Sequence, residues 1–129
     1  MKWLFLMIND KHSNMALYFI TQNNEIYGFL KSQINAVLDN HTAKDALELA
    51  RIYLLKKAIG KGIGKAVMET VDKIARSHAK KIVWLKTMDS SDAATFYQNY
   101  GYEIYGQTRL KVVGIYPELQ GQLIMKKLL

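Results

Sequence analysis

Three glycines at alternate positions, Gly60, Gly62 and Gly64, separate a stretch rich in β-branched and large apolar residues from a stretch with helical periodicity. Glycine loses more backbone freedom on folding than any other residue, so three of them at a helix entrance indicate a need for bare backbone. The free amides of a first helical turn, together with the helix dipole, favour an anion such as pyrophosphate. A purely structural turn is the alternative interpretation.

The spacing of these glycines excludes two known phosphate cradles. A dinucleotide fingerprint requires a third glycine where Lys65 stands, and a P-loop requires four residues between its glycines, whereas Gly60 and Gly64 have three between them. Lys65 is also followed by Ala66 rather than by Ser or Thr. The pattern therefore predicts a strand that leads through a glycine turn into a helix, and it fits neither motif.

The 129 residues predict a single domain over 1–129 with α+β or mixed α/β architecture. A hairpin over 16–35 turns at Asn23-Asn24, a pair that tolerates positive φ. Apolar positions at helical spacing predict a helix, with His78 on its apolar stripe. A later short helix has Asp89 or Ser90 as its cap and Gly101 just past its end. The predicted elements are strands over 16–35 (two), a strand over 45–55, a helix over 61–78, a strand over 81–87, a helix within 89–101, and strands over 102–110 and 121–129.

Composition limits the function classes. The chain has no cysteine, which excludes disulfides and thiolate sites, and His12, His41 and His78 lack metal-ligand spacing, so no metal is expected. The apolar run Trp3 to Ile8 is too short for a membrane span, and a cytoplasmic protein with no membrane partner is expected. The net charge of +7 favours a polyanionic partner. Nucleic acid is disfavoured because no basic run alternates with aromatic residues.

A second constellation lies at "SSDAATFYQNYGY", residues 90–102. Together with the glycine turn it resembles the GNAT family of acetyl-coenzyme A dependent N-acetyltransferases, whose motifs are Q/R-x-x-G-x-G/A and N-x-x-A-x-x-F-Y-x-x-x-G-F. Ala93, Phe96, Tyr97 and Gly101 match, and Tyr102 replaces Phe. The ending "GQLIMKKL" is similar to the PaiA-like branch, which acetylates spermidine and spermine. The resemblance implies a central, mostly antiparallel sheet with splayed middle strands and flanking helices.

The resemblance also implies acetyl-coenzyme A as cosubstrate and a set of residues that hold it. The main chain of one strand would bind the pantetheine arm, with a free amide near Leu54 facing the developing oxyanion. The glycine turn would bind the pyrophosphate, and a residue at the start of the second motif would add a polar contact. These residues are Ile52, Tyr53 and Leu54 on the strand, Ile59, Gly60, Lys61, Gly62, Ile63, Gly64 and Lys65 at the turn, and Ser90.

For catalysis the resemblance implies that Glu48 is the general base and that Tyr97 protonates the departing thiolate. By strand alternation Glu48 shares a face with Ala50, Ile52 and Leu54, while Arg51 points to the opposite face and is read as structural or peripheral. The acceptor is a primary amine on a polyamine, another small molecule or a peptide. Departures at Ile59, Ser90 and Ala50, where the family has Gln or Arg, Asn and a second acidic residue, motivate the alternative of a non-catalytic acetyl-coenzyme A binding regulator.

The N-terminal end departs from the family pattern. Only fifteen residues precede Ala16, whereas a strand and two helices need more than ~25 residues, so the first unit of the family is incomplete. The strand over 16–21 would then lie at an uncovered sheet edge. The segment 3–8 is expected as a substitute edge strand or a remnant helix that packs against a second copy of the chain, giving a homodimer. The acceptor site is expected to be wide and turnover slow or absent.

Overall fold

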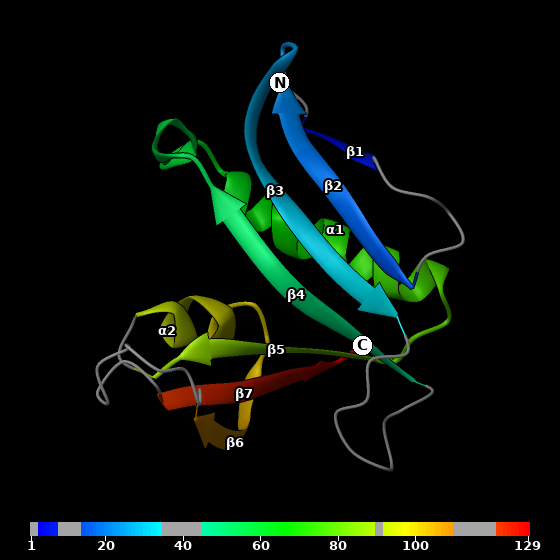
Figure 1. The fold of residues 1–129 in the computed structure, drawn as a ribbon, viewed down its shortest axis with the longest axis vertical. Helices are drawn as coiled ribbons and strands as arrows, with labels where there is room; N and C mark the ends of the chain where they lie inside the picture. Colours follow the sequence, from blue (N-terminus) through cyan, green and yellow to red (C-terminus); the bar gives the residue numbers. More distant parts are fainter. Residues whose placement is uncertain (1–2, 8–13, 35–44, 90–91, 110–120) are drawn as a thin grey trace.

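The computed structural model describes residues 3–7, 14–34, 45–89, 92–109 and 121–129. These residues form one sheet in the order β1-β2-β3-β4-β5-β7-β6, with two α-helices packed on it (Figure 1). The predicted α+β class, with a mostly antiparallel sheet and flanking helices, is confirmed. The elements are β1 (Leu4–Met7), β2 (Met15–Gln22), β3 (Glu25–Ile34), β4 (Ala46–Leu54), a 3-10 turn (Lys56–Ala58), α1 (Ile63–Ser77), β5 (Ile82–Met88), α2 (Ala93–Gln98), β6 (Glu103–Arg109) and β7 (Gly121–Leu128).

The N-terminal half of the sheet is a three-stranded meander. Asn23 and Asn24 have φ angles of 53° and 63°, the pair of positive values that a type I′ turn requires, so the predicted hairpin is confirmed. β1 pairs antiparallel with β2, which settles 3–8 as containing a strand and corrects the expectation that 16–21 lies at the sheet edge. Leu4, Leu6 and Met7 on this edge strand are about half exposed (49%, 50% and 51%), and their packing against a second copy stays a prediction.

Helix α1 covers one face of the sheet, behind β2, β3 and β4 in Figure 1. Its apolar stripe is buried, and it joins side chains of β3, β4 and β5 in one core. We call this side of the sheet the helix face and the other side the opposite face. His78 lies at the C-cap of α1 and is exposed, so its predicted place in the core or at the core edge is wrong. The buried stripe consists of Ile63, Val67, Met68, Val71, Ile74 and Ala75.

The two halves of the sheet meet at β4 and β5, which run parallel but pair over three residues only. The pairs join Ala46 to Ile82, Leu47 to Val83 and Glu48 to Trp84. Beyond Glu48 the two strands diverge, as Figure 1 shows, and β5 pairs instead along its whole length with β7. The splayed middle strands that the family resemblance implied are therefore present.

A β-bulge in β4 decides which side chains share a face. Lys31 of β3 lies opposite Arg51, while Ser32 lies opposite Leu49, so Ala50 is the extra residue on β4. One extra residue reverses the alternation of faces along a strand. Glu48 therefore shares the opposite face with Arg51 and not with Ile52 and Leu54, which corrects both sequence-based assignments.

The short helix α2 begins later than predicted. Its N-cap is Asp92, which makes no side-chain capping bond, and Ser90 lies outside the described residues. Asp89 is not the cap, because its amide donates to the carbonyl of Gly121 at 3.1 Å and ties it to β7. Gly101 has a φ of 96° just past the helix, as expected for a glycine that ends it.

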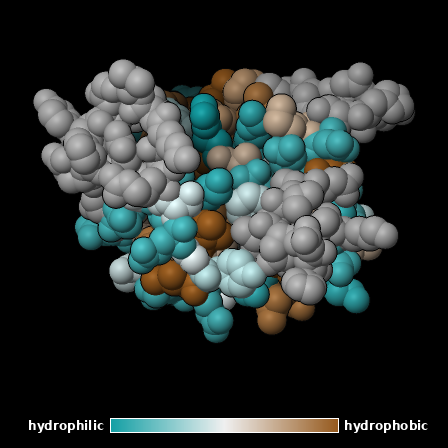
Figure 2. Space-filling model, turned by 60° about the horizontal axis from the view of Figure 1, so that its bottom comes forward, coloured by the Kyte–Doolittle hydropathy of each residue, from teal (hydrophilic) through white to brown (hydrophobic). Residues whose placement is uncertain are grey.

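The surface at the β6 and β7 end of the molecule is mixed in character. Figure 2 shows hydrophobic residues there in small separate patches among hydrophilic ones, in the part that is not drawn grey. No helix of the described residues is long and apolar enough to cross a membrane.

Leu47 tests the core that supports the divergence of β4 and β5. Its side chain is fully buried (0% exposed) one residue before the last paired rung. Leu47→Ala should lower the free energy of unfolding by about 2–5 kcal/mol, because it removes buried methyl groups and leaves a cavity. Leu128→Ala, on a side chain 70% exposed, is the control and should change stability by less than about 0.5 kcal/mol. Equal urea midpoints for the two variants would contradict this account of the core.

Candidate active site

The divergence of β4 and β5 opens a cavity of about 440 Å³. It is lined by main chain and side chains of both strands, and by one residue each from α2 and β7. The lining residues are Leu49, Ala50, Arg51, Ile52, Leu85, Lys86, Thr87, Met88, Tyr97 and Gln122.

The cavity connects the two faces of the sheet. Tyr97 reaches it from α2, whose aromatic side chains pack into the core on the helix face. Arg51 and Lys86 reach it from the opposite face, because Arg51 follows the bulge and Lys86 is two residues beyond Trp84, the partner of Glu48. A ligand bound on the helix face and a second ligand on the opposite face can therefore meet between the strands.

Tyr97 is held by neighbouring aromatic rings. Its ring lies edge-on to Phe96 and to Tyr102, with centroids 5.3 and 5.8 Å away. Burial raises the pKa of the Tyr97 phenol, so the group keeps its proton at neutral pH. A protonated phenol in this position can donate a hydrogen bond or a proton into the cavity.

Glu48 lies at the narrow end of the divergence, on the last paired rung and one residue before the cavity lining begins. The side chain is half-buried, and this burial raises the pKa of its carboxyl, while Lys86 and Lys31 act in the opposite direction. A raised pKa brings the carboxyl closer to the pH range in which a base works well. The structure thus places both predicted catalytic residues at the divergence, Tyr97 within the cavity and Glu48 at its end.

The glycine turn has the conformation and the free donors of an anion site. Gly60 and Gly62 have φ angles of 82° and 74°, and a Cβ at either position would meet nothing within 4 Å. Within the described part of the chain, none of the amides of residues 60–65 donates a backbone hydrogen bond, and the first such donor is Ala66, to Gly62 at 3.4 Å. These amides are therefore open to an anion, and the binding of a pyrophosphate by Gly60, Lys61, Gly62 and Ile63 stays a prediction.

Three further residues that were predicted to hold the cosubstrate lie at this turn, and their part in binding stays a prediction. Ile59 is 73% exposed. The Lys65 ammonium lies 4.0 Å from Glu69 and remains exposed. Gly64 has a packing role that the sequence did not reveal, since a Cβ there would lie 3.0 Å from the Phe96 ring. Gly64 therefore lets α2 approach α1 closely, which links the glycine turn to the helix that carries Tyr97.

The main chain of β4 beyond the bulge faces the cavity. The amide of Leu55 donates to Tyr27 of β3 at 2.8 Å. Because alternate residues of a strand direct their amides to the same side, the amide of Leu54 points away from β3, toward the divergence. The side chain of Tyr53 stands on the opposite face, stacked on Phe29 with centroids 5.8 Å apart.

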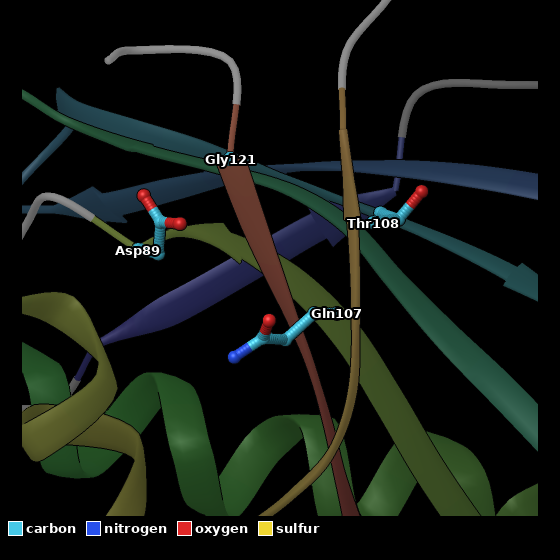
Figure 3. Close-up of a pocket in the computed structure, with 4 residues that line it drawn as sticks. All are labelled: Asp89, Gln107, Thr108 and Gly121. Atoms are coloured by element: carbon cyan, nitrogen blue, oxygen red, sulfur yellow. The ribbon is translucent and has the colours of Figure 1, made fainter.

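A smaller polar pocket of about 180 Å³ adjoins the end of β5. It is formed by Asp89, Gln107, Thr108 and Gly121, and Figure 3 shows the Gln107 side chain crossing β7 toward the side of Asp89 while the Thr108 hydroxyl points away. Any Cβ at position 121 would overlap the Asp89 carboxylate, so the glycine permits this approach. No sequence motif had indicated this pocket.

The described residues contain no group of three or more His, Cys, Asp or Glu side chains that could hold a metal ion. Among sequence-predicted site residues, Ser90 lies outside the described residues. The residues that sequence reasoning missed are Arg51, Lys86 and Lys31. The place of Arg51 beside Glu48 depends on the bulge, whereas the places of Lys31 and Lys86 follow from the pairing of Glu48 with Gln33 and Trp84. The sequence carries one sign of this bulge. Large apolar residues alternate along the strand up to Leu49, and the two successive residues Ala50 and Arg51 then interrupt the alternation.

The site combines diverging parallel strands, a glycine turn before the intervening helix and a tyrosine at the gap. The family model of the acetyltransferase (GNAT) domain matches residues 13–104, and the chain therefore belongs to the GNAT acetyltransferase family. The predicted GNAT resemblance is thereby confirmed, whereas the finer assignment to the PaiA-like branch stays a prediction.

Individual relatives agree with this assignment. A protein of Lactobacillus delbrueckii subsp. lactis, described as an uncharacterized N-acetyltransferase, is 27% identical over 113 residues, which are 87% of this chain and 64% of that protein. This chain thus spans less than two thirds of that relative's length.

Two solved structures share the fold. The IAA acetyltransferase from Bacillus cereus superimposes with a TM-score of 0.73 at 17% identity, covering 90% of this chain and 79% of that one. A GNAT family acetyltransferase from Elizabethkingia anophelis, solved with acetyl-CoA bound, has a TM-score of 0.73 at 23% identity and covers 90% and 77% of the two chains.

The buried phenol of Tyr97 should titrate late. The protein is labelled with ¹³C in its tyrosine rings, and the NMR signal of Tyr97 is assigned by its loss in Tyr97→Phe. The pH midpoint of this signal should lie above the ordinary value of about 10, because burial disfavours the phenolate. In urea, which unfolds the protein, the midpoint should return to about 10. The same midpoint in the folded and unfolded protein would contradict the buried position of this ring.

Proposed function

We propose that the chain is an acetyl-CoA dependent N-acetyltransferase that transfers acetyl to a primary amine in a ternary complex. The observation that carries the proposal is the cavity between β4 and β5, which Tyr97 lines and which begins one residue beyond Glu48. The glycine turn with its free amides follows β4 in the chain and supports the proposal. The acetyl-CoA bound to the Elizabethkingia relative supports the choice of cosubstrate. With no helix in the described residues able to cross a membrane, a cytoplasmic location is part of the proposal.

The cosubstrate would lie along β4 and end at the glycine turn. The amides of residues 60–65 would bind its pyrophosphate, and the main chain of Ile52–Leu54 would bind its pantetheine arm. Bound acetyl-CoA supplies an acetyl group activated as a thioester. The Leu54 amide, which points toward the divergence, would stabilise negative charge on the acetyl oxygen.

Proton transfers would fall to two side chains from opposite faces. Glu48, directly or through water, would accept a proton from the amine as the new carbon–nitrogen bond forms. Tyr97, protonated at neutral pH because burial raises its pKa, would donate its proton to the sulfur as the carbon–sulfur bond breaks. The likeness of the C-terminal segment to the spermidine and spermine branch makes a polyamine one acceptor to test.

Cosubstrate binding tests the glycine turn. Gly62→Ala should raise the Kd for acetyl-CoA about tenfold or more, because a side chain at a φ of 74° strains the turn and moves its converging amides. Gly106→Ala is a matched control, because its Cβ would meet only Ile124 Cδ1 at 3.9 Å. Calorimetry gives both constants. An unchanged Kd in folded Gly62→Ala would remove the turn from the binding site.

Steady-state thiol release with a panel of amines tests the catalytic roles. Glu48→Gln should lower kcat/KM by roughly 10²–10⁴-fold, and Tyr97→Phe should slow transfer with little effect on the Kd for acetyl-CoA. Because burial raises the pKa of Glu48, its carboxyl is protonated at a higher pH than an exposed glutamate, so wild-type kcat/KM should fall as the pH is lowered through this range. Glu48→Gln should lose this dependence.

Glu103→Gln, on an exposed side chain of β6, is the control and should keep wild-type rates. Wild-type rates in both Glu48→Gln and Tyr97→Phe would show that other groups or water move the protons. Acetyl-CoA binding without transfer to any amine would favour the alternative of a non-catalytic binding protein.

A further inference from the structure

We infer that the acceptor is a small amine that carries an anionic group, a carboxylate or a phosphate, close to its amino group. This inference rests on the proposed function and names the acceptor class for the same site. It follows from the side chains that surround the mouth of the cavity on the opposite face of the sheet, where the cosubstrate does not lie.

Three cations gather on that face beside one carboxylate. Lys31 and Arg51 lie opposite one another on β3 and β4, on the face of Glu48. Lys86 follows Trp84 by two residues on β5 and therefore also lies on the face of Glu48. Arg51 and Lys86 line the cavity itself, one from each of the diverging strands. Lys31 and Lys86 are near enough to act on the charge of Glu48.

These cations have no partner of their own. Among the described residues none of the three forms a hydrogen bond or an ion pair within contact distance, although other lysines do. The paired ones are Lys57 with Glu25, Lys65 with Glu69 and Lys127 with Asp72. The positive charge at the cavity mouth is thus left for a ligand, since nothing in the described residues neutralises it beyond the single carboxylate of Glu48.

The charge balance opposes a polyamine. Among the residues that the structure describes, three cations against Glu48 leave the mouth net positive, and the balance stays positive if Asp89 of the neighbouring pocket is counted with it. Once one ammonium group of a polyamine had reached Glu48, its remaining ammonium groups would lie among these cations. An amine with an adjacent anion would instead offer its amino group to Glu48 and its anion to Arg51 and Lys86.

The spacing suits a short acceptor. Because Ala50 is the bulge residue, Arg51 lies two rungs beyond Glu48 on the ladder with β3, and Lys86 lies two residues beyond Trp84. At ~3.3 Å per residue, each is about 7 Å farther along the strands than Glu48. Both side chains are long enough to reach back over part of this distance. The guanidinium fork of Arg51 also matches the two oxygens of a carboxylate or phosphate.

Matched acceptor pairs test the inference. L-alanine is compared with L-alaninamide, and O-phosphoethanolamine with ethanolamine, and spermidine is the polycationic acceptor. Two quantities are measured: kcat/KM with acetyl-CoA by thiol release, and the Kd for each amine by calorimetry with the protein saturated with coenzyme A. The anionic member of at least one pair should be preferred about tenfold or more, and the pair that shows it identifies carboxylate or phosphate. Alaninamide has the more easily deprotonated amine, so amine basicity alone would favour the amide.

Two variants assign the preference to the cations. The variants are compared at a pH well above the range in which Glu48 titrates, because removal of the Lys86 charge also changes the pKa of Glu48. There Arg51→Gln and Lys86→Gln should each raise KM and Kd for the anionic acceptor with little change in kcat, and should change the values for its neutral partner much less. Lys73→Gln, an exposed cation on α1, is the control and should change neither. Arg51 and Lys86 are exposed, so the variants should fold, and thermal melting checks this.

Preference for spermidine, preference for the neutral members, no binding of any anionic member, and variants that keep the wild-type preference would each overturn the inference. Preferred transfer to spermidine would do so while leaving the acetyltransferase proposal intact. Anion-selective binding without transfer to any amine would support the inference and contradict the proposed catalysis.

Discussion

The parting of β4 and β5 after the Glu48–Trp84 rung is the constraint on which the rest of the molecule depends. β4 stays paired with β3 and β5 with β7, so neither strand can follow the other, and one edge of each is left without a neighbour. Unpaired main-chain groups inside a protein cost free energy unless another molecule or water satisfies them. An extended ligand bound between the strands could satisfy these main-chain groups. The two helices pack on the helix face, and charged side chains surround the gap on the opposite face.

The bulge at Ala50 decides the chemistry of that second face. Without the extra residue, Arg51 would point toward the helix face, where Leu49 and Ile52 contribute to the core, and an unpaired guanidinium there would be costly. With it, Arg51 joins Lys31 and Glu48 on one side of the sheet. Bulges commonly re-aim side chains next to functional sites. The same insertion thus keeps the core apolar and gives the cavity mouth its positive charge.

The features predicted correctly from the sequence are those that short stretches determine. The Asn23-Asn24 hairpin, the apolar stripe of α1 and the glycine that follows α2 each follow from local conformational preferences. The divergence of the middle strands was predicted only from the family resemblance, because strands that diverge have no local sequence signature. The face of Arg51 was predicted wrongly, because the register with β3 defines the bulge and the break in apolar alternation at Ala50-Arg51 was its only local sign. The segment 3–8 was ambiguous because a run of six apolar residues suits a short strand and a helical turn equally well.

The packing around α2 links the parts of the site that lie far apart in the sequence. Phe96 fits against Gly64 in the first turn of α1, and the next residue, Tyr97, lines the cavity. On the other side of Tyr97 stands Tyr102, whose ring lies 5.9 Å from the Lys127 ammonium, and this lysine is held 2.7 Å from Asp72 of α1. Breaking the half-buried pair of Lys127 and Asp72 would leave a charge without compensation beside an aromatic cluster. The phenol at the cavity is therefore positioned from two places on α1, through Gly64 in the first turn and through the ion pair of Asp72 farther along the helix. A six-residue helix with no side-chain cap of its own depends on such contacts for its place.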